Sequence, residues 1–548
     1  MAKKIRDQRP KKIGEAVIEL PAKPISPGSP RVGRAPERFD QEINQSLDAY
    51  ESLLISGDRL DVEKKVQRIT GSLWKAKRRV APIIVERLIY GRAKVPFVAF
   101  EMLGSFAGGK TRAFLKEIAE DGRAADVVRF GARRRMGWAE RGEAKTRRAF
   151  LGTLRDAEST LVLAVSQSGA FWPPDGEIIA EAVGYVAAIP VEEGLRVLAR
   201  ASREVAGVVL PWFLRPVLHL EKPALQNAAL AELVRLGDKA SSGAVHRLAM
   251  TAKGATVREE AAAIARRFQF HVVSHGEVAP EAPAFPPVHR VWATPVDGAG
   301  TQAVVLARRW DNGQLLAADV LCKDTWGIRD AFGTYHLAEE ELEDLLSVFT
   351  EGLDEPAPGM VEIDLPKARG IIAAAVEINA ASRRPVLPGF EIWEPLFHDR
   401  WPPEPDERAE IAELDDARLA KRIDLYQRSG ELLEDQFFGS WFFDVEEILP
   451  LLPGILPPSR GRMTDRQYRP LIEGLVDDEM RRLIRQRLRR QAWLLDRTGK
   501  VRLRDTSLAA AAQLAPDAER RLGDHPLLRA MIDRSIENAF MFAATDFL

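Results

Sequence analysis

A phosphate-binding pattern is the most chemically suggestive feature of the sequence. Residues 104–111 read GSFAGGKT and match G-x-x-x-x-G-K-T. The fixed positions of that pattern are Gly104, Gly109, Lys110 and Thr111. In a P-loop, backbone N–H groups and the lysine surround phosphate oxygens while the hydroxyl binds Mg²⁺, and the loop joins a strand to a helix. The preceding VPFVAFEML and the following RAFLKEIAED could supply those elements, so a P-loop NTPase is one hypothesis.

Two features of the sequence disfavour this hypothesis. Lys145 begins the segment KTRRAFL, which repeats the residues around the motif without a glycine before the lysine. The shared pattern therefore belongs to an internal repeat. In addition, the apolar stretch STLVLAVSQSG at 159–169 lacks the carboxylate that ends the second strand of a nucleotide site. We expect no cofactor.

Other catalytic and metal-binding patterns are incomplete. His271 and His275 are four residues apart and would share one face of a helix, with His289 as a third candidate ligand, but the glutamate of H-E-x-x-H is missing. The only cysteine, Cys322, falls in a predicted strand, and there is no G-x-S-x-G pattern. We therefore expect no catalytic residue and no metal, and we favour a protein that is not an enzyme.

Positive charge is concentrated between Arg481 and Arg504, where ten Lys or Arg accompany one acidic residue, Asp496. Such a helix could bind a phosphate backbone or an acidic partner, or it could pair with the acidic stretches 337–346 and 404–416. The candidate contact residues are Arg481, Arg485, Arg489 and Arg490. Residues 1–38 hold ten Lys or Arg, four Asp or Glu and six Pro, which predicts a disordered basic tail.

Helical periodicity and an internal repeat organise the first half of the chain. From about residue 39 to 275 apolar residues recur at spacings of three and four. Residues 102–121 align without a gap on residues 182–201, and the pattern recurs at 135–154 and 232–250. Each unit reads as an apolar helix, a short turn with glycine and a second apolar helix. Stacking such units would bury a continuous core.

The turns of these units resemble those of HEAT-like helical repeats. The resemblance is carried by Met102-Leu103-Gly104, Ala182-Val183-Gly184 and Leu236-Gly237-Asp238, and it extends over about 39–275. It implies an α-solenoid whose extended surface binds a protein partner. The exposed positions expected on the second helix of each unit are Lys116, Arg196 and His246.

A small α+β domain is expected at 289–400, after a Pro-rich linker at 276–288. HRVWATPV, TQAVVLARRW and QLLAADVLCK read as strands, and Asn312-Gly313 would form a type I′ hairpin turn. Residues 326–349 and 364–384 read as helices.

This stretch resembles an uncharacterised bacterial α+β domain that often accompanies helical repeats and carries no known activity. Where such a domain would place a cysteine-containing turn before G-x-x-D-A-F, this chain has Asp324-Thr325-Trp326, which disfavours thiol chemistry. After WPPEPDE at 401–407, the rest of 401–548 reads as a helical C-terminal domain. Within it, five aromatic residues in QFFGSWFFD (436–444) are expected to be core.

Composition narrows the class of protein. The 548 residues contain 79 Lys or Arg and 80 Asp or Glu, which excludes a globally basic nucleic-acid binder but allows a local basic patch. One cysteine excludes a disulfide framework. No secretory signal and no apolar stretch of about 20 residues is present, so we expect a cytoplasmic protein that does not enter a membrane.

The sequence therefore predicts a multi-domain, mainly α protein. A HEAT-like α-solenoid at 39–275 precedes the α+β domain, which contains a β-hairpin, and the helical C-terminal region. The expected function is a non-catalytic scaffold or adaptor that binds a protein partner. The alternatives are a nucleic-acid-associated protein using the basic tail and the arginines of 481–504, and, disfavoured, the P-loop NTPase.

Overall fold

The computed structural model describes residues 38–56, 69, 71, 73–74, 77–93, 96–136, 144–169, 172–237, 241–274, 284–347, 360–397, 417–452, 463–518 and 520–545. The predicted basic tail (except Arg38), most of the linker at 276–288, and the linker at 401–407 lie outside these residues. The described residues are mostly helical and contain one antiparallel sheet of five strands. It divides into two compact units, residues 1–160 and 161–548.

The first unit is built from helices alone in its described residues. They are α2 (Arg38–Ser56), α4 (Lys77–Ile89), α5 (Pro96–Ala107), the 3₁₀ turn η1 (Gly108–Lys110), α6 (Thr111–Glu120), α7 (Asp126–Met136), α8 (Ala144–Leu151) and the start of α9 (Ala157–Ser168). Besides its neighbour in sequence, α4 contacts α6 and α5 contacts α7. Their apolar faces form one core that includes Leu88, Leu103 and Ile118.

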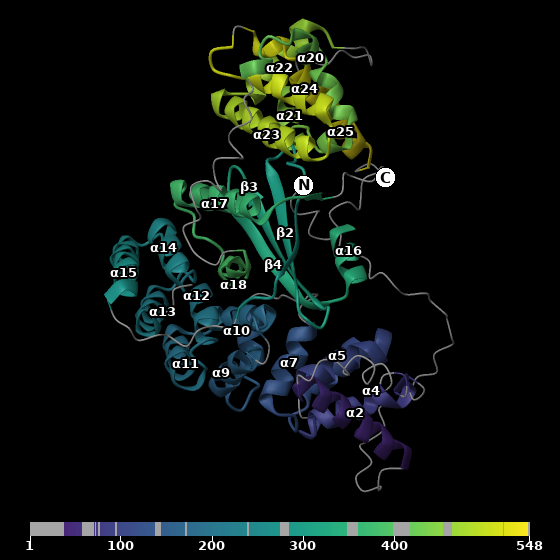
Figure 1. Ribbon diagram of the computed structural model, residues 1–548, viewed down its shortest axis with the longest axis vertical. Helices are drawn as coiled ribbons and strands as arrows, with labels where there is room; N and C mark the ends of the chain where they lie inside the picture. The colour runs from purple at the N-terminus through teal and green to yellow at the C-terminus, as the bar shows by residue number, and fades with distance from the viewer. Residues whose placement is uncertain are drawn as a thin grey trace. The chain divides into compact units, whose positions relative to one another are not determined.

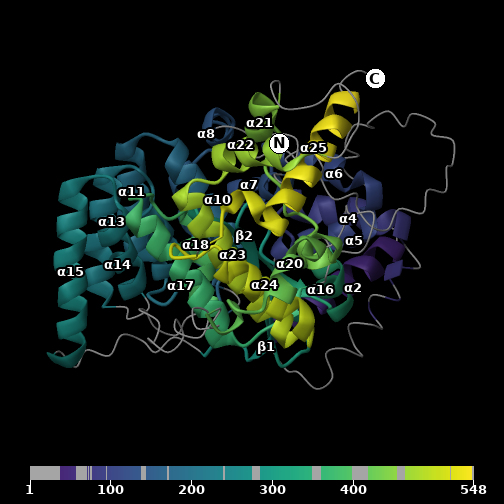
Figure 2. The same ribbon diagram turned by 90° about the horizontal axis from the view of Figure 1, so that it is seen from above.

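Six further helices begin the second unit. They are α10 (Gly176–Ala188), α11 (Val191–Glu204), α12 (Leu210–Val217), α13 (Pro223–Leu236), α14 (Ser241–Thr251) and α15 (Ala255–Ser274). Within this set, helices two apart along the chain contact one another, so that α10, α12 and α14 form one row and α11, α13 and α15 a second row (Figure 1). Figure 2 shows the second row again as adjacent helices. The row of α10, α12 and α14 contacts the helices α17 (Leu365–Ala381) and α18 (Pro388–Trp393), which pack on the sheet.

The sheet has the strand order β4-β3-β2-β1-β5. Its strands are β1 (Val288–Ala293), β2 (Thr301–Arg309), β3 (Leu315–Lys323), β4 (Gly327–Leu337) and β5 (Val361–Glu362). The helix α16 (Glu339–Ser347) buries Leu342 against the face that carries Val305 and Leu315. The helices α17 (Leu365–Ala381) and α18 (Pro388–Trp393) contact β3 and β4, and Figure 1 shows them across the sheet from α16.

The structure confirms the three predicted strands and the helix expected at 364–384, but it corrects the helix expected at 326–349. Residues 327–337 form β4, and helix begins only at Glu339. Gly327 has a φ of +91°, which breaks a helix at its start. The unpaired edge of β3 then takes β4 as an antiparallel partner along its length. Local helical spacing was therefore outweighed by pairing across the sheet.

The β2–β3 hairpin is also confirmed, with a different turn from the one expected. Gly313 has a φ of +84°, but Asn312 is not in the left-handed region. The Gly313 N–H donates to the Trp310 carbonyl and the Trp310 N–H donates to the Gln314 carbonyl. This is the pattern of a type I turn followed by a glycine bulge, which needs only one left-handed residue.

The C-terminal helices pack around one another and around the predicted aromatic core. They include α20 (Ile423–Gln427), η4 (Ser429–Glu434), α21 (Val445–Ile448), α22 (Asp465–Leu475), α23 (Asp478–Arg497), α24 (Val501–Ala512) and α25 (Pro526–Thr545). Phe438 and Trp441 are fully buried, as expected for 436–444. The Trp441 indole N–H donates to the Val296 carbonyl at 2.9 Å, which joins this group to the loop between β1 and β2. No helix of the described residues is long and apolar enough to cross a bilayer.

Candidate interaction surface at the β3–β4 corner

The turn Asp324-Thr325-Trp326 joins β3 to β4. The backbone directly after this turn packs too closely against α17 to allow a side chain at Gly327. A Cβ added to Gly327 would lie 2.1 Å from the Asn379 Oδ1 atom. That oxygen accepts a hydrogen bond from the Ile328 N–H at 2.7 Å. Asn379 is fully buried near the end of α17, so α17 fixes the start of β4.

Trp326 is exposed at this corner and lies beneath two guanidinium groups. The Arg384 guanidinium is 4.0 Å from the centre of a Trp326 ring and that of Arg329 is 4.7 Å. Arg384 also donates to the Thr325 carbonyl at 2.9 Å. A tryptophan with 39% of its surface exposed is thus held in a fixed geometry, and its arginines are oriented by cation–π contacts.

On its other side, the same turn is attached to the interior by a buried ion pair. Asp324 is buried and accepts from Arg487 Nε at 2.7 Å and from Arg487 Nη2 at 3.0 Å. A Cβ on Gly300 would lie 2.0 Å from the Asp324 carboxylate, so the loop between β1 and β2 closes over this ion pair. The corner is therefore attached to α23 on one side while it presents Trp326 on the other.

A second buried ionic cluster fixes the helical rows to the sheet. Arg247 on α14 donates to both oxygens of Glu391, and its Nη1 atom donates to Glu394 Oε1 at 3.0 Å. His219 Nε2 lies 2.9 Å from Glu391 Oε1. All four side chains are buried. Burial raises the pKa of Glu391, but the charges and hydrogen bonds of Arg247 and His219 together lower it by more, so Glu391 stays ionised. Burial raises the pKa of Glu394.

The partner-binding residues expected from the repeats lie in different settings. Lys116 is exposed on α6, with its Nζ atom 4.0 Å from Glu120 Oε1. Arg196 is exposed on α11, in the row away from the sheet's helices. His246 is half-buried on α14, in the row that contacts α17, and burial followed by the charge of Arg247 lowers its pKa.

The arginines of α23 mostly make contacts within the protein. Arg481 donates to the carbonyls of Leu514 and Ala515 after α24. Arg485, Arg489 and Arg490 are half-buried, and burial lowers the pKa of Arg490. Arg487, the arginine of α23 that pairs with Asp324 at the sheet corner, does not stand out in the sequence.

The pattern at 104–111 lies in a helical setting. Gly104 belongs to α5, Gly109 and Lys110 form the turn η1, and Thr111 begins α6. The Thr111 hydroxyl donates to the Gly108 carbonyl at 2.6 Å. The strand that a P-loop requires before its glycines is replaced here by the helix Pro96–Ala107.

The candidate histidine ligands that the structure describes lie in different surroundings. His271 lies in the last turn of α15, and His275 lies outside the described residues. His289 Nε2 is 3.0 Å from Glu339 Oε1 and lies against Arg309. The part of the chain that the structure describes contains no cluster of three or more potential metal ligands.

Sequence reasoning missed the two clusters that organise the second unit. Glu391 and Glu394 stand in the otherwise apolar stretch FEIWEPLF (390–397), and carboxylates in such a stretch are a signal for buried ion pairs. In the sequence, Trp326 stands out only as part of the turn that replaces the expected cysteine-containing turn. Nothing in the spacing of Arg329 and Arg384 places them beside it.

Comparison with known proteins gives no assignment: no family model, no curated protein and no solved structure matches the chain. The resemblance to HEAT-like repeats therefore stays a prediction.

Proposed function

We propose that the protein is a non-catalytic scaffold that binds a protein partner, with the β3–β4 corner as the anchor. The observation that carries this proposal is the exposed Trp326 held beneath Arg384 and Arg329. Tryptophan and arginine are the residues most enriched among the energetic centres of protein interfaces. An anchor that is already ordered loses little side-chain entropy when it binds.

The helical rows supply the frame for this role, and we propose that they are a HEAT-like α-solenoid. The alternating contacts of α10–α15 support this proposal, because solenoid helices contact the equivalent helix of the next repeat. The buried Arg247 cluster holds one row against the sheet. The other row leaves Arg196 on its outer side as a second contact, and a cytoplasmic location remains part of the same proposal.

The test begins with the full-length protein as bait in its native host, with nuclease present throughout. A partner recovered in a fixed ratio is then purified and titrated against wild type and Trp326→Ala. We expect Trp326→Ala to weaken binding about 30-fold, which corresponds to a hot-spot loss of about 2 kcal/mol.

Phe540→Ala is the matched control, because Phe540 is also an exposed aromatic, on α25. We expect it to bind like wild type. The proposal is overturned if no partner is recovered in a fixed ratio, or if Trp326→Ala binds as tightly as Phe540→Ala.

A further inference from the structure

The near-neutral net charge conceals two oppositely charged parts. Residues 1–160 contain 34 Lys or Arg and 21 Asp or Glu, a net charge of +13. Residues 161–548 contain 45 Lys or Arg and 59 Asp or Glu, a net charge of −14. Within the second unit, residues 161–290 carry no net charge, and the whole negative excess lies in residues 291–548. Charge asymmetry of this size points to a polyanionic partner for the first unit.

Exposed cations lie on helices α6 and α8 and on the turn before α6. On these elements the exposed cations are Lys110, Arg112, Lys116, Lys145 and Arg148, and α6 also exposes Glu117 and Glu120. Helix α7, between them in sequence, ends in Arg133-Arg134-Arg135, which are half-buried. Ion pairs between exposed side chains contribute little to stability. Such side chains can therefore turn to phosphate groups at small cost.

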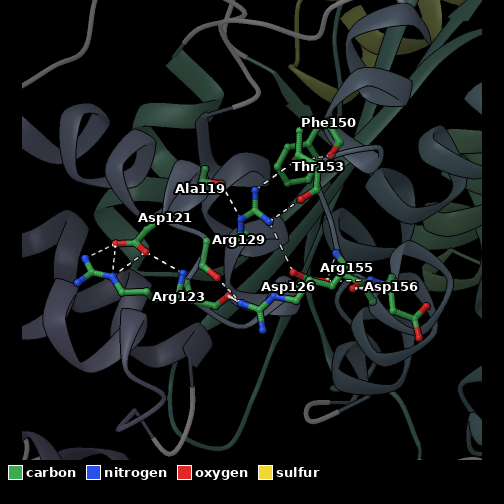
Figure 3. A network of polar contacts seen from close by, with 12 residues as sticks. Ala119, Asp121, Arg123, Asp126, Arg129, Phe150, Thr153, Arg155 and Asp156 are labelled. Carbon is green, nitrogen blue, oxygen red and sulfur yellow. Dashed lines mark hydrogen bonds and ion pairs between the residues drawn. The ribbon is translucent and has the colours of Figure 1, made fainter.

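A buried polar network fixes these helices to one another (Figure 3). Arg129 on α7 is buried and donates from Nε to the Ala119 carbonyl of α6 at 2.9 Å. Its Nη1 atom donates to the carbonyl of Thr153, just after α8, at 2.8 Å. The cations of α6 and α8 are therefore carried on a frame with one geometry.

Asp126 and Asp121 complete this frame. The Asp126 carboxylate accepts from the backbone N–H of Arg155 at 2.6 Å and of Asp156 at 3.0 Å, which ties α7 to the start of α9. A hydrogen bond from Arg123 lowers the pKa of Asp121, so that carboxylate stays charged in the turn after α6. The network thus holds the loops between α6 and α9 through contacts within the first unit.

We propose that the surface formed by α6–α8 binds the sugar-phosphate backbone of a nucleic-acid duplex. No large hydrophobic side chain is exposed among the described residues of α6–α8. Single-stranded nucleic acid is usually held by stacking on exposed aromatics, and a membrane surface by inserted apolar side chains. Helices with several exposed cations and neither feature fit a duplex backbone. The acidic excess of residues 291–548 repels the same ligand, which favours the first unit as the place of contact.

The test measures binding of full-length protein to a fluorescent 20-base-pair DNA duplex of random sequence by anisotropy, from 50 to 200 mM salt. Four neutralised phosphates give a slope of about −3.6 in log K against log salt, so affinity should fall by about 100-fold over this range. The variant Lys110→Glu/Lys116→Glu/Lys145→Glu/Arg148→Glu should bind at least about tenfold more weakly at 50 mM salt and show a flatter slope.

The matched control reverses four exposed cations of the second unit, Arg203→Glu/Lys253→Glu/Arg418→Glu/Lys421→Glu, and changes net charge equally. It should bind within about twofold of wild type. The proposal is overturned if the duplex does not bind at 50 mM salt, if the control loses as much affinity, or if single strands bind more tightly. Equal affinity for anionic lipid vesicles overturns it too. Because nuclease is present in the partner-capture experiment, failure here is distinguishable from failure of the scaffold proposal.

Discussion

At the scale of single residues, Arg247 is the side chain whose removal should cost the second unit most. It is fully buried and forms ion pairs with Glu391 and Glu394. Replacing it by methionine removes the guanidinium that pairs with both buried carboxylates, which destabilises by about 3–5 kcal/mol. We therefore expect Arg247→Met to lower the urea midpoint of the second unit sharply, measured by hydrogen exchange of peptides from α14 and α18.

The matched control for that prediction is Arg235→Met on α13. Arg235 also pairs with a glutamate, Glu232, but it is exposed. Exposed pairs contribute about 0–1 kcal/mol, so exchange should change little. Equal effects of the two substitutions would mean that the buried cluster does not hold the helical rows to the sheet.

Asp319 gives the second unit a dependence on pH. It is buried on β3 and its carboxylate has no hydrogen-bond partner among the described residues. Burial, followed by the charge of Asp330, raises its pKa from 3.8 to about 8. The folded state thus binds a proton that the unfolded state releases between about pH 4 and 8. The free energy of unfolding should therefore fall as pH rises through that window.

Asp319→Asn removes the titrating group and should remove this contribution. We expect the variant to be more stable than wild type at pH 9, by on the order of a few kcal/mol, with a smaller difference at pH 5. The measurement is the urea midpoint of exchange for β3 peptides at the two pH values. A wild-type gain in stability from pH 5 to 9, or an unchanged slope in the variant, would contradict the assignment.

At the scale of elements, α23 shows how one helix can serve both surface and core. Arg487 joins the helix to Asp324 at the sheet corner through a buried ion pair, whereas Arg482, five residues earlier, is exposed. We expect Arg487→Met to release the corner and to raise exchange in residues 322–328, because Asp324 would be left buried and unpaired. Arg482→Met should leave those peptides protected, and loss of protection in both variants would contradict the anchoring role.

Elements with a strong local signal could be predicted from the sequence. The strands around Asn312-Gly313 and the helix at 364–384 follow from periodicity and turn chemistry. The strand β4 could not, because GIRDAFGTYHL is decided by the open edge of β3. The corner surface also depends on long-range contacts, since Trp326 and Arg384 are 58 residues apart. The buried carboxylates of 390–397 were visible in the sequence, but their partner Arg247 was not.

At the scale of the whole molecule, the division at residue 160 predicts that the two units lose structure separately. Leu103 on α5 is fully buried in the core of the first unit, and Ile372 on α17 is fully buried in the second. Leu→Ala or Ile→Ala at such a site costs about 2–5 kcal/mol. Leu103→Ala should therefore lower the denaturant midpoint of exchange for peptides of α4–α7 and leave those of β1–β4 unchanged. Ile372→Ala should do the reverse. If either substitution lowered both midpoints equally, the units would fold as one cooperative body, and the opposite charges of the two parts would have to be considered as a single field rather than as two independent surfaces.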